Sequence, residues 1–273
     1  MTLLSDQADA VRALVQAADP GAVWAVGGPD GPQAGSGGAD DSHDVGGLTA
    51  VLALWPAVGT LVDEGALRLH TPLAAYGDEA AADTPAGTTA HHLLTHPGGT
   101  AALTRLVEHL SGRPLTDLAA ARVWHPLGMT RTRLADGTLR APLADLARFL
   151  THLLHPSDPG DPGTLSDPNG SGTPGGTPGP PPPTRAWTAE SLRIRTGELG
   201  PARGLLWQPA PNGVWTHHAP AEPGPAVWIS PRHRRWALLL PAARGPLRTT
   251  FREAVFPPAA AAPSSSRGGV PRA

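Results

Sequence analysis

The chain has 273 residues and a formal net charge of −2 at pH 7, with 40% apolar residues, 33 glycines, 33 prolines and no cysteine. This length and apolar content predict one domain with a hydrophobic core. The near-neutral charge offers no general attraction to nucleic acid or to anionic membranes, and the lack of cysteine excludes disulfides and thiolate metal sites. The sequence has no signal peptide and no apolar run long enough to cross a membrane, so we expect a cytoplasmic protein.

The N-terminal part predicts a helix and two strands. Apolar residues recur at helical spacing over residues 3–18. Residues 21–26 are typical of a strand, and residues 27–31 form its expected turn. Residues 32–38 predict a second, weaker strand. The expected order at this end is therefore helix, strand, turn, strand.

A second region, residues 44–67, predicts a buried helix over residues 48–64. Pro56 lies inside this helix. An interior proline lacks the N–H that the helix needs and costs about 3 kcal/mol unless the helix kinks or restarts. We therefore expect a break at Trp55 and Pro56, with Pro56 opening a second helix.

Further blocks follow in the central part of the chain. His-Leu-Leu-Thr-His-Pro-Gly-Gly occupies residues 92–99, Pro-Leu-Gly-Met-Thr-Arg-Thr residues 126–132, and Asp-Leu-Ala-Arg-Phe-Leu residues 145–150. His92 and His96 would share a face of a helix, but no His-Glu-x-x-His arrangement is present. We therefore interpret His91, His92 and His96 as structural, and we expect no metal or other cofactor.

Two segments have compositions that favour disorder. Residues 157–184 contain 16 prolines or glycines in 28 positions, a composition that cannot bury apolar surface. The tail at 259–273 consists mainly of small and polar residues. We expect a single domain over residues 1–258, with a disordered insertion at 157–184.

The C-terminal half predicts the strands of a sheet. Residues 203–207, 227–231 and 237–241 are the expected strands, and His217-His218-Ala219-Pro220 precedes the second of them. We interpret the run at 232–235 as a solvated hairpin turn. The tryptophans of this half are expected to pack in the core or at its rim rather than to bind a ligand.

Taken in order, these blocks resemble serine β-lactamases, penicillin-binding proteins and related esterases. The segments at 44–51 and 61–67 are similar to the nucleophile helix of that family, and the later blocks match the family's order. The resemblance implies an α+β fold in which N- and C-terminal strands form one antiparallel sheet flanked by helices, here with a reduced helical subdomain.

The same resemblance implies that the reactive groups of the family are missing. Gly47 stands where the family has its nucleophilic serine, and Ala50 where it has the lysine; the whole chain contains no lysine. The Ser-x-x-Lys pair works because positions i and i+3 share one helix face, so the amine can help to deprotonate the hydroxyl. Neither Gly47 nor Ala50 can supply these groups.

Two other family elements are damaged. The resemblance implies that the loop that carries Tyr-x-Asn is deleted, because Gly99-Thr100 runs directly into a predicted helix and the only tyrosine, Tyr76, lies elsewhere. At the Lys/His-Thr-Gly motif, alignment from the left places His218, whereas counting back from Trp228 places Ala219. The vestigial site positions are thus Gly47, Ala50 and His218, and no intact catalytic site is expected.

Three hypotheses for function remain. The first is a β-lactamase-like domain without catalysis, acting as a binding or scaffold module for an unknown small-molecule or protein ligand, with no nucleic-acid or membrane partner. The second is an active esterase or amidase whose nucleophile is displaced to Thr49 or Ser42, with His43 or His218 nearby. The third is a decaying gene product without a role. A closed apolar filling beside Gly47 would favour a scaffold, and an open cleft lined by His218 and tryptophans would favour ligand capture.

Overall fold

The computed structural model describes residues 5–156, 183–197, 200–219 and 223–258. Its main feature is an antiparallel sheet with the strand order β2-β1-β9-β8-β7-β6. N-terminal strands thus pair directly with C-terminal strands, as the resemblance implied. The strands are β1 (Val23–Gly28), β2 (Gly31–Gly35), β6 (Gln208–Ala210), β7 (Val214–His218), β8 (Ala226–Ser230) and β9 (Arg235–Leu240).

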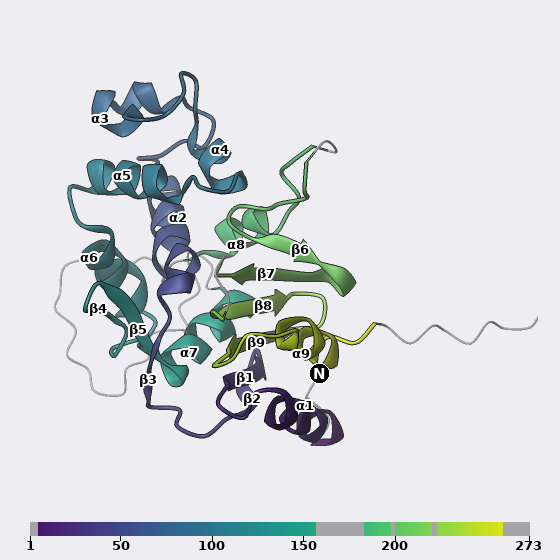
Figure 1. The fold of residues 1–273 in the computed structure, drawn as a ribbon. Helices are drawn as coiled ribbons and strands as arrows, with labels where there is room; N and C mark the ends of the chain where they lie inside the picture. The colour runs from purple at the N-terminus through teal and green to yellow at the C-terminus, as the bar shows by residue number, and fades with distance from the viewer. Residues whose placement is uncertain (1–4, 157–182, 198–199, 220–222, 259–273) are drawn as a thin grey trace, which may run out of the picture.

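Helices cover both faces of this sheet (Figure 1). On one face lie α1 (Ser5–Ala18) and α9 (Leu247–Val255), which contact each other. On the other face α7 (Leu143–Leu154) crosses the sheet, with the remaining helices beyond it. These are α2 (Trp55–Asp63), α3 (Asp78–Ala81), α4 (Ala90–Thr95), α5 (Thr100–Ser111), α6 (Leu115–Ala119) and α8 (Arg185–Ser191).

The period-two pattern of the strands divides the core in two. Trp24 and Val26 of β1 pack with the α1 and α9 residues, whereas Ala25 packs with the larger cluster around α2, α5 and α7. In β9, Leu239 likewise packs with the α1 and α9 residues, and Leu238 packs with the larger cluster. Successive residues of a strand point to opposite faces, so one strand serves both layers. The domain therefore has an antiparallel sheet between two helical layers.

A small second sheet joins the helical part. It has the order β3-β5-β4, from β3 (Ser42–Asp44), β5 (Thr138–Pro142) and β4 (Arg133–Ala135). This sheet was not predicted, because Ser42-His43-Asp44 has low strand propensity. β3 holds the chain in place immediately before residues 46–54.

The region of Pro56 shows how the predicted break is accommodated. The chain passes from a 3₁₀ turn (Gly46–Leu48) into a π-helical segment (Ala50–Leu54) and then into α2, so the helix continues through Trp55 and Pro56. In an α-helix Pro56 would have to donate to the carbonyl of Leu52, which it cannot do. That carbonyl instead accepts the indole N–H of Trp124 at 2.8 Å. Pro56 thus stands in the first turn of α2, as predicted, and the π-helical segment takes the place of the expected break before it.

Other sequence predictions are confirmed with shifted ends. The helix at 3–18 corresponds to α1, and the last two strands to β8 and β9. The second strand ends at Gly35 instead of residue 38. Residues 203–207 were wrongly predicted as a strand: they form a loop in which Leu206 has a φ of 62°, and β6 begins at Gln208.

The turn at 232–235 also differs in part from its prediction. Arg235 is only 6% exposed, because it is the first residue of β9 and its guanidinium donates to the carbonyl of Val255 at 2.8 Å. The predictions for residues 157–182 and 259–273 lie outside the described residues. Among the residues that are described, no helix has the length and apolar character needed to cross a membrane.

Candidate functional site

The sequence-predicted site lies where the 3₁₀ turn before α2 meets the end of β7. β3 and the pairing of Val45 with Leu139 hold the chain entering this turn. On the opposite side, His218 is the last residue of β7 and pairs with Ala226 of β8. Ala219 follows, and its N–H donates to the carbonyl of Pro225 at 2.9 Å. This pairing brings Ala219 against Gly47.

The contact between Gly47 and Ala219 leaves no room for a side chain at position 47. A Cβ atom built on Gly47 would lie 2.5 Å from Cβ of Ala219 and 3.1 Å from Cγ of Pro225. Carbon atoms that are not bonded do not approach this closely without displacement of the backbone. The methyl group of Ala219 therefore fills the space that a side chain of residue 47 would need.

An open cleft of about 680 Å³ nevertheless remains beside this contact. It lies between α4 and α5 on one side and β6 and β7 on the other (Figure 1). Gly47, Ala50 and His218 all line it, so the structure brings the three predicted positions together. The cleft is also lined by Thr49, His96, Arg203, Leu206, Trp207 and His217.

Two histidines of β7 line the cleft, and the sequence singled out only His218. His217 has its Nδ1 2.8 Å from the carbonyl oxygen of Leu206, so Nδ1 carries a proton and donates. Burial lowers the pKa of His217 to about 4, against a smaller opposing effect of this hydrogen bond. His217 is therefore uncharged at neutral pH, with a lone pair on Nε2. Nδ1 of His218 donates to the carbonyl of Ala219 at 3.1 Å.

Trp207 forms a wall of the cleft and is only 1% exposed. Its ring lies edge-on to Trp55, with centroids 5.8 Å apart, and to His217 at 6.5 Å. Its indole N–H is buried and has no acceptor among the described residues. The buried indoles of Trp55, Trp124, Trp187 and Trp236 all donate to an acceptor. Packing of the tryptophans was correctly predicted, and the unpaired donor of Trp207 was not.

The candidates for a displaced nucleophile lie in two places. Ser42 and His43 belong to β3 and do not line the cleft. Thr49 does line it, but its hydroxyl donates to the carbonyl of Gly46 at 2.8 Å. A hydroxyl becomes a nucleophile when it donates to a general base. In this arrangement the proton of Thr49 is directed to the backbone.

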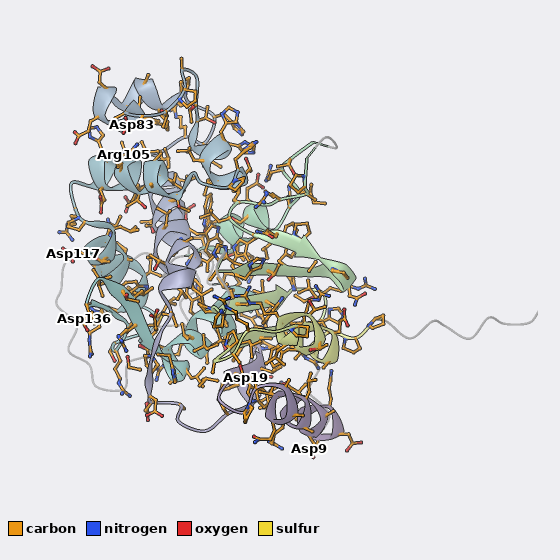
Figure 2. All side chains as sticks on the ribbon, viewed as in Figure 1. Asp9, Asp19, Asp83, Arg105, Asp117 and Asp136 are labelled. Carbon is orange, nitrogen blue, oxygen red and sulfur yellow. The ribbon has the colours of Figure 1, made fainter. Side chains whose placement is uncertain are left out.

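The connection between α4 and α5 is short. Only residues 96–99 separate α4 from α5, and Gly98 and Thr100 line the cleft at this point. Tyr76 lies at the end of another turn, where its hydroxyl accepts from the backbone N–H of Arg68 at 2.8 Å. No aspartate or glutamate is among the described residues that line the cleft, and the aspartates labelled in Figure 2 lie elsewhere in the molecule.

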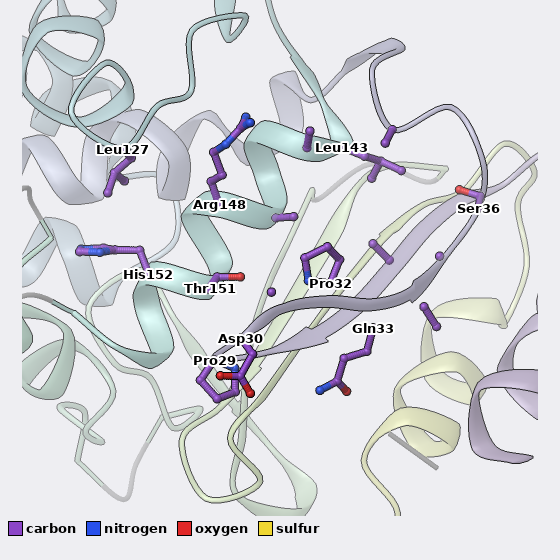
Figure 3. A pocket seen from close by; sticks show the side chains of 17 residues that line it. Pro29, Asp30, Pro32, Gln33, Ser36, Leu127, Leu143, Arg148, Thr151 and His152 are labelled. Carbon is purple, nitrogen blue, oxygen red and sulfur yellow. The ribbon is translucent and has the colours of Figure 1, made fainter. Parts of the chain in front are cut away.

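A second cavity, of about 780 Å³, lies between β2 and α7. Figure 3 shows Pro32 of β2 across from Arg148 and Thr151 of α7. Nη1 of Arg148 donates to the buried carboxylate of Asp145 at 2.7 Å, and Nε2 of His152 lies 2.9 Å from the carbonyl of Pro183. Arg148 and His152 thus have partners within the protein, and no buried unpaired polar atom of the described residues lines this groove. It contains none of the predicted site positions.

The fold is shared with several solved structures. A β-lactamase from Mycobacterium bovis matches with a TM-score of 0.60 and 20% identity, over 87% of this chain and 93% of the other. A β-lactamase from Sulfitobacter matches with a TM-score of 0.68 and 13% identity, over 92% and 96%. A D-alanine carboxypeptidase from Burkholderia cenocepacia matches with a TM-score of 0.66 and 14% identity, over 92% and 97%.

The chain therefore has the fold of serine β-lactamases and penicillin-binding proteins. At these levels of identity the likeness concerns the fold and does not extend to activity. No protein-family model and no curated protein sequence matches the chain.

Proposed function

We propose that this domain binds a small molecule in the cleft beside Gly47 without forming a covalent bond to it, and that it has lost hydrolysis. The observation that supports the proposal is the close contact of Gly47 with Ala219, because a Cβ on Gly47 would lie 2.5 Å from Cβ of Ala219 and residue 47 has no room for a side chain. Restoring a serine there would require the backbone to move.

The open cleft supports ligand binding over a purely structural role. Its volume of about 680 Å³ lies within the range of small-molecule sites, which combine apolar walls with a few polar groups. The unpaired indole N–H of Trp207 is such a group, because a buried donor without an acceptor costs about 1–3 kcal/mol. A ligand with a hydrogen-bond acceptor would recover this energy.

The competing proposal is an esterase or amidase with a displaced nucleophile. Thr49 is the candidate that lines the cleft, and the neutral His217 is a base on the same cleft. The hydrogen bond from Thr49 to Gly46 argues against this pairing. Ester turnover that is lost on Thr49→Ala would support the hydrolase instead.

The loss of covalent chemistry is tested by intact mass spectrometry after incubation with a fluorescent penicillin and with a fluorophosphonate. We expect the mass of the protein to remain unchanged with both reagents. A stoichiometric adduct, competed away by unlabelled reagent, would overturn the proposal and identify the displaced nucleophile.

Binding is tested by NMR with a library of fragments that each carry a carbonyl or carboxylate acceptor. We expect at least one fragment to shift the indole N–H resonance of Trp207 reversibly. The resonance is assigned by its loss in Trp207→Phe, and Trp236→Phe serves as the matched control because Trp236 lies outside the cleft. If no fragment shifts this resonance, the cleft does not capture ligands of this kind and the binding proposal fails.

A further inference from the structure

Three histidines line the cleft, and each of them uses the same ring nitrogen for a backbone contact. His96 follows α4, whereas His217 and His218 end β7. Nδ1 lies 3.0 Å from a backbone carbonyl oxygen in His96, 2.8 Å in His217 and 3.1 Å in His218. A carbonyl oxygen can only accept, so each Nδ1 carries a proton and donates it. In the neutral ring, Nε2 is therefore an acceptor.

His217 is the best defined of these acceptors. Burial lowers its pKa to about 4, so its ring stays neutral at neutral pH. The hydrogen bond to Leu206 keeps the proton on Nδ1, and Nε2 is then an acceptor at every pH well above 4. A ligand group that meets this nitrogen must therefore bring a proton of its own. A carboxylate has no such proton, whereas an amide N–H has one.

Trp207 supplies the opposite kind of group on the same wall. Its buried indole N–H has no acceptor among the described residues, and its ring centroid lies 6.5 Å from that of His217. The two rings are close enough for one small polar group to make a hydrogen bond of about 2.9 Å to each. The cleft is also lined by the apolar side chains of Leu54, Leu94 and Leu115. This lining suits a ligand with an apolar body and one polar end.

We propose that the cleft binds a molecule that carries a primary carboxamide on an apolar ring, in preference to the corresponding carboxylate. The carbonyl oxygen of the amide accepts from the indole of Trp207, and its NH₂ group donates to Nε2 of His217. The second amide N–H is left for one of the other two histidines. A carboxylate has acceptors alone, so it would leave Nε2 of His217 unpaired. The assignment rests on the proposed function, because it specifies the ligand of the same cleft.

The test is an NMR titration of the full chain at pH 8 with benzamide, acetophenone and benzoate. The three probes share one ring and are nearly equal in size. Acetophenone keeps the carbonyl but has a methyl group in place of the NH₂, and benzoate has acceptors alone. We expect benzamide to bind about ten-fold more tightly than either, the effect of one buried hydrogen bond. Nitrogen spectra of the imidazole rings should show the proton of His217 on Nδ1, and benzamide should shift the Nε2 resonance.

The matched variant is His217→Asn. Its shorter side chain can donate to Leu206 in place of Nδ1, but it does not reach the position of Nε2. It should weaken benzamide binding by about ten-fold and leave acetophenone binding unchanged. His233→Asn is the control and should change neither, because Nδ1 of His233 also has a partner, the hydroxyl of Ser230 at 2.8 Å, and His233 lies outside the cleft. Melting curves verify folding, and the three probes on the unchanged chain decide the test if His217→Asn does not fold.

The outcomes separate this inference from the proposed function. If acetophenone or benzoate binds as tightly as benzamide, the cleft binds small molecules but the inference is wrong. Benzoate binding that disappears in Arg203→Met would show that the guanidinium of Arg203, which also lines the cleft, selects a carboxylate instead. A proton on Nε2 of His217 would also overturn the inference. If benzamide fails to bind while other fragments shift the Trp207 resonance, the inference alone fails, and if no fragment binds, the proposed function fails with it.

Discussion

The cleft beside Gly47 and the groove between β2 and α7 are similar in volume, about 680 and 780 Å³, but their polar groups differ. In the groove, Arg148 pairs with Asp145, and Thr151 accepts the indole N–H of Trp236 at 3.1 Å. In the cleft, the indole N–H of Trp207 and the buried Nε of Arg203 have no acceptor among the described residues. Volume alone does not separate the two cavities, whereas unpaired buried donors do.

This difference has a physical basis in stability. A folded protein gains little from leaving a buried donor unpaired, and most buried polar groups are paired. Where such groups gather at one cavity, a partner from outside the chain is the simplest explanation. The groove holds none of the buried unpaired polar atoms found among the described residues, whereas two residues that line the cleft, Trp207 and Arg203, each carry one. The cleft is therefore the candidate for binding.

The largest expected effect is on the groove side, at Asp145. This carboxylate is 1% exposed and accepts from the backbone N–H of Arg131 and the hydroxyl of Thr132, both at 3.0 Å, in addition to Arg148. Asp145→Ala should lower the free energy of unfolding by roughly 2–4 kcal/mol, because buried donors lose their acceptor. Denaturant unfolding measures this change.

The control for Asp145 is Arg148→Met. The guanidinium of Arg148 is half exposed, so its loss should cost less than about 1 kcal/mol. Equal costs for the two variants would show that the ion pair, rather than the buried donors, determines the effect.

The second prediction concerns the contact that closes position 47. Gly47→Ala should destabilise the domain by about 1–3 kcal/mol, because its Cβ would lie 2.5 Å from that of Ala219. The double variant Gly47→Ala with Ala219→Gly should recover a large part of this loss. Gly37→Ala, where no atom lies within 4 Å of the new Cβ, is the control. A Gly47→Ala variant as stable as the parent would show that the contact between Gly47 and Ala219 leaves room for a side chain.

The sheet and the order of the helices were predictable from sequence, but the contacts of the site were not. The strands of β8 and β9 are continuous apolar runs that predict buried strands whatever their neighbours. The contact of Gly47 with Ala219 depends on the register of β7 against β8, and alignment alone left His218 and Ala219 both open. The hydrogen bond from the indole of Trp124 to the carbonyl of Leu52 likewise joins residues 72 positions apart, so no local sequence pattern predicts it.

The residues that define the binding proposal were missed for a related reason. His217 stands beside His218, and only the folded structure distinguishes them, through the burial that lowers the pKa of His217 and its hydrogen bond to Leu206. Leu206 has its carbonyl in that position because its backbone is left-handed, an unusual conformation for leucine. The paired histidines at the end of a strand were the available signal. No sequence pattern indicated that the buried Nε of Arg203 would lack an acceptor among the described residues.

The smallest expected effect compares one tryptophan from each cavity. Trp207→Phe removes an indole N–H that has no acceptor, whereas Trp236→Phe removes one that donates to Gly28 and Thr151. Both indoles are fully buried, so both changes leave a similar void. Trp236→Phe should therefore cost about 1 kcal/mol more than Trp207→Phe, which is the net value of one hydrogen bond. Denaturant unfolding of the two variants measures the difference, and a larger cost at Trp207 would mean that its N–H already has a partner in solution.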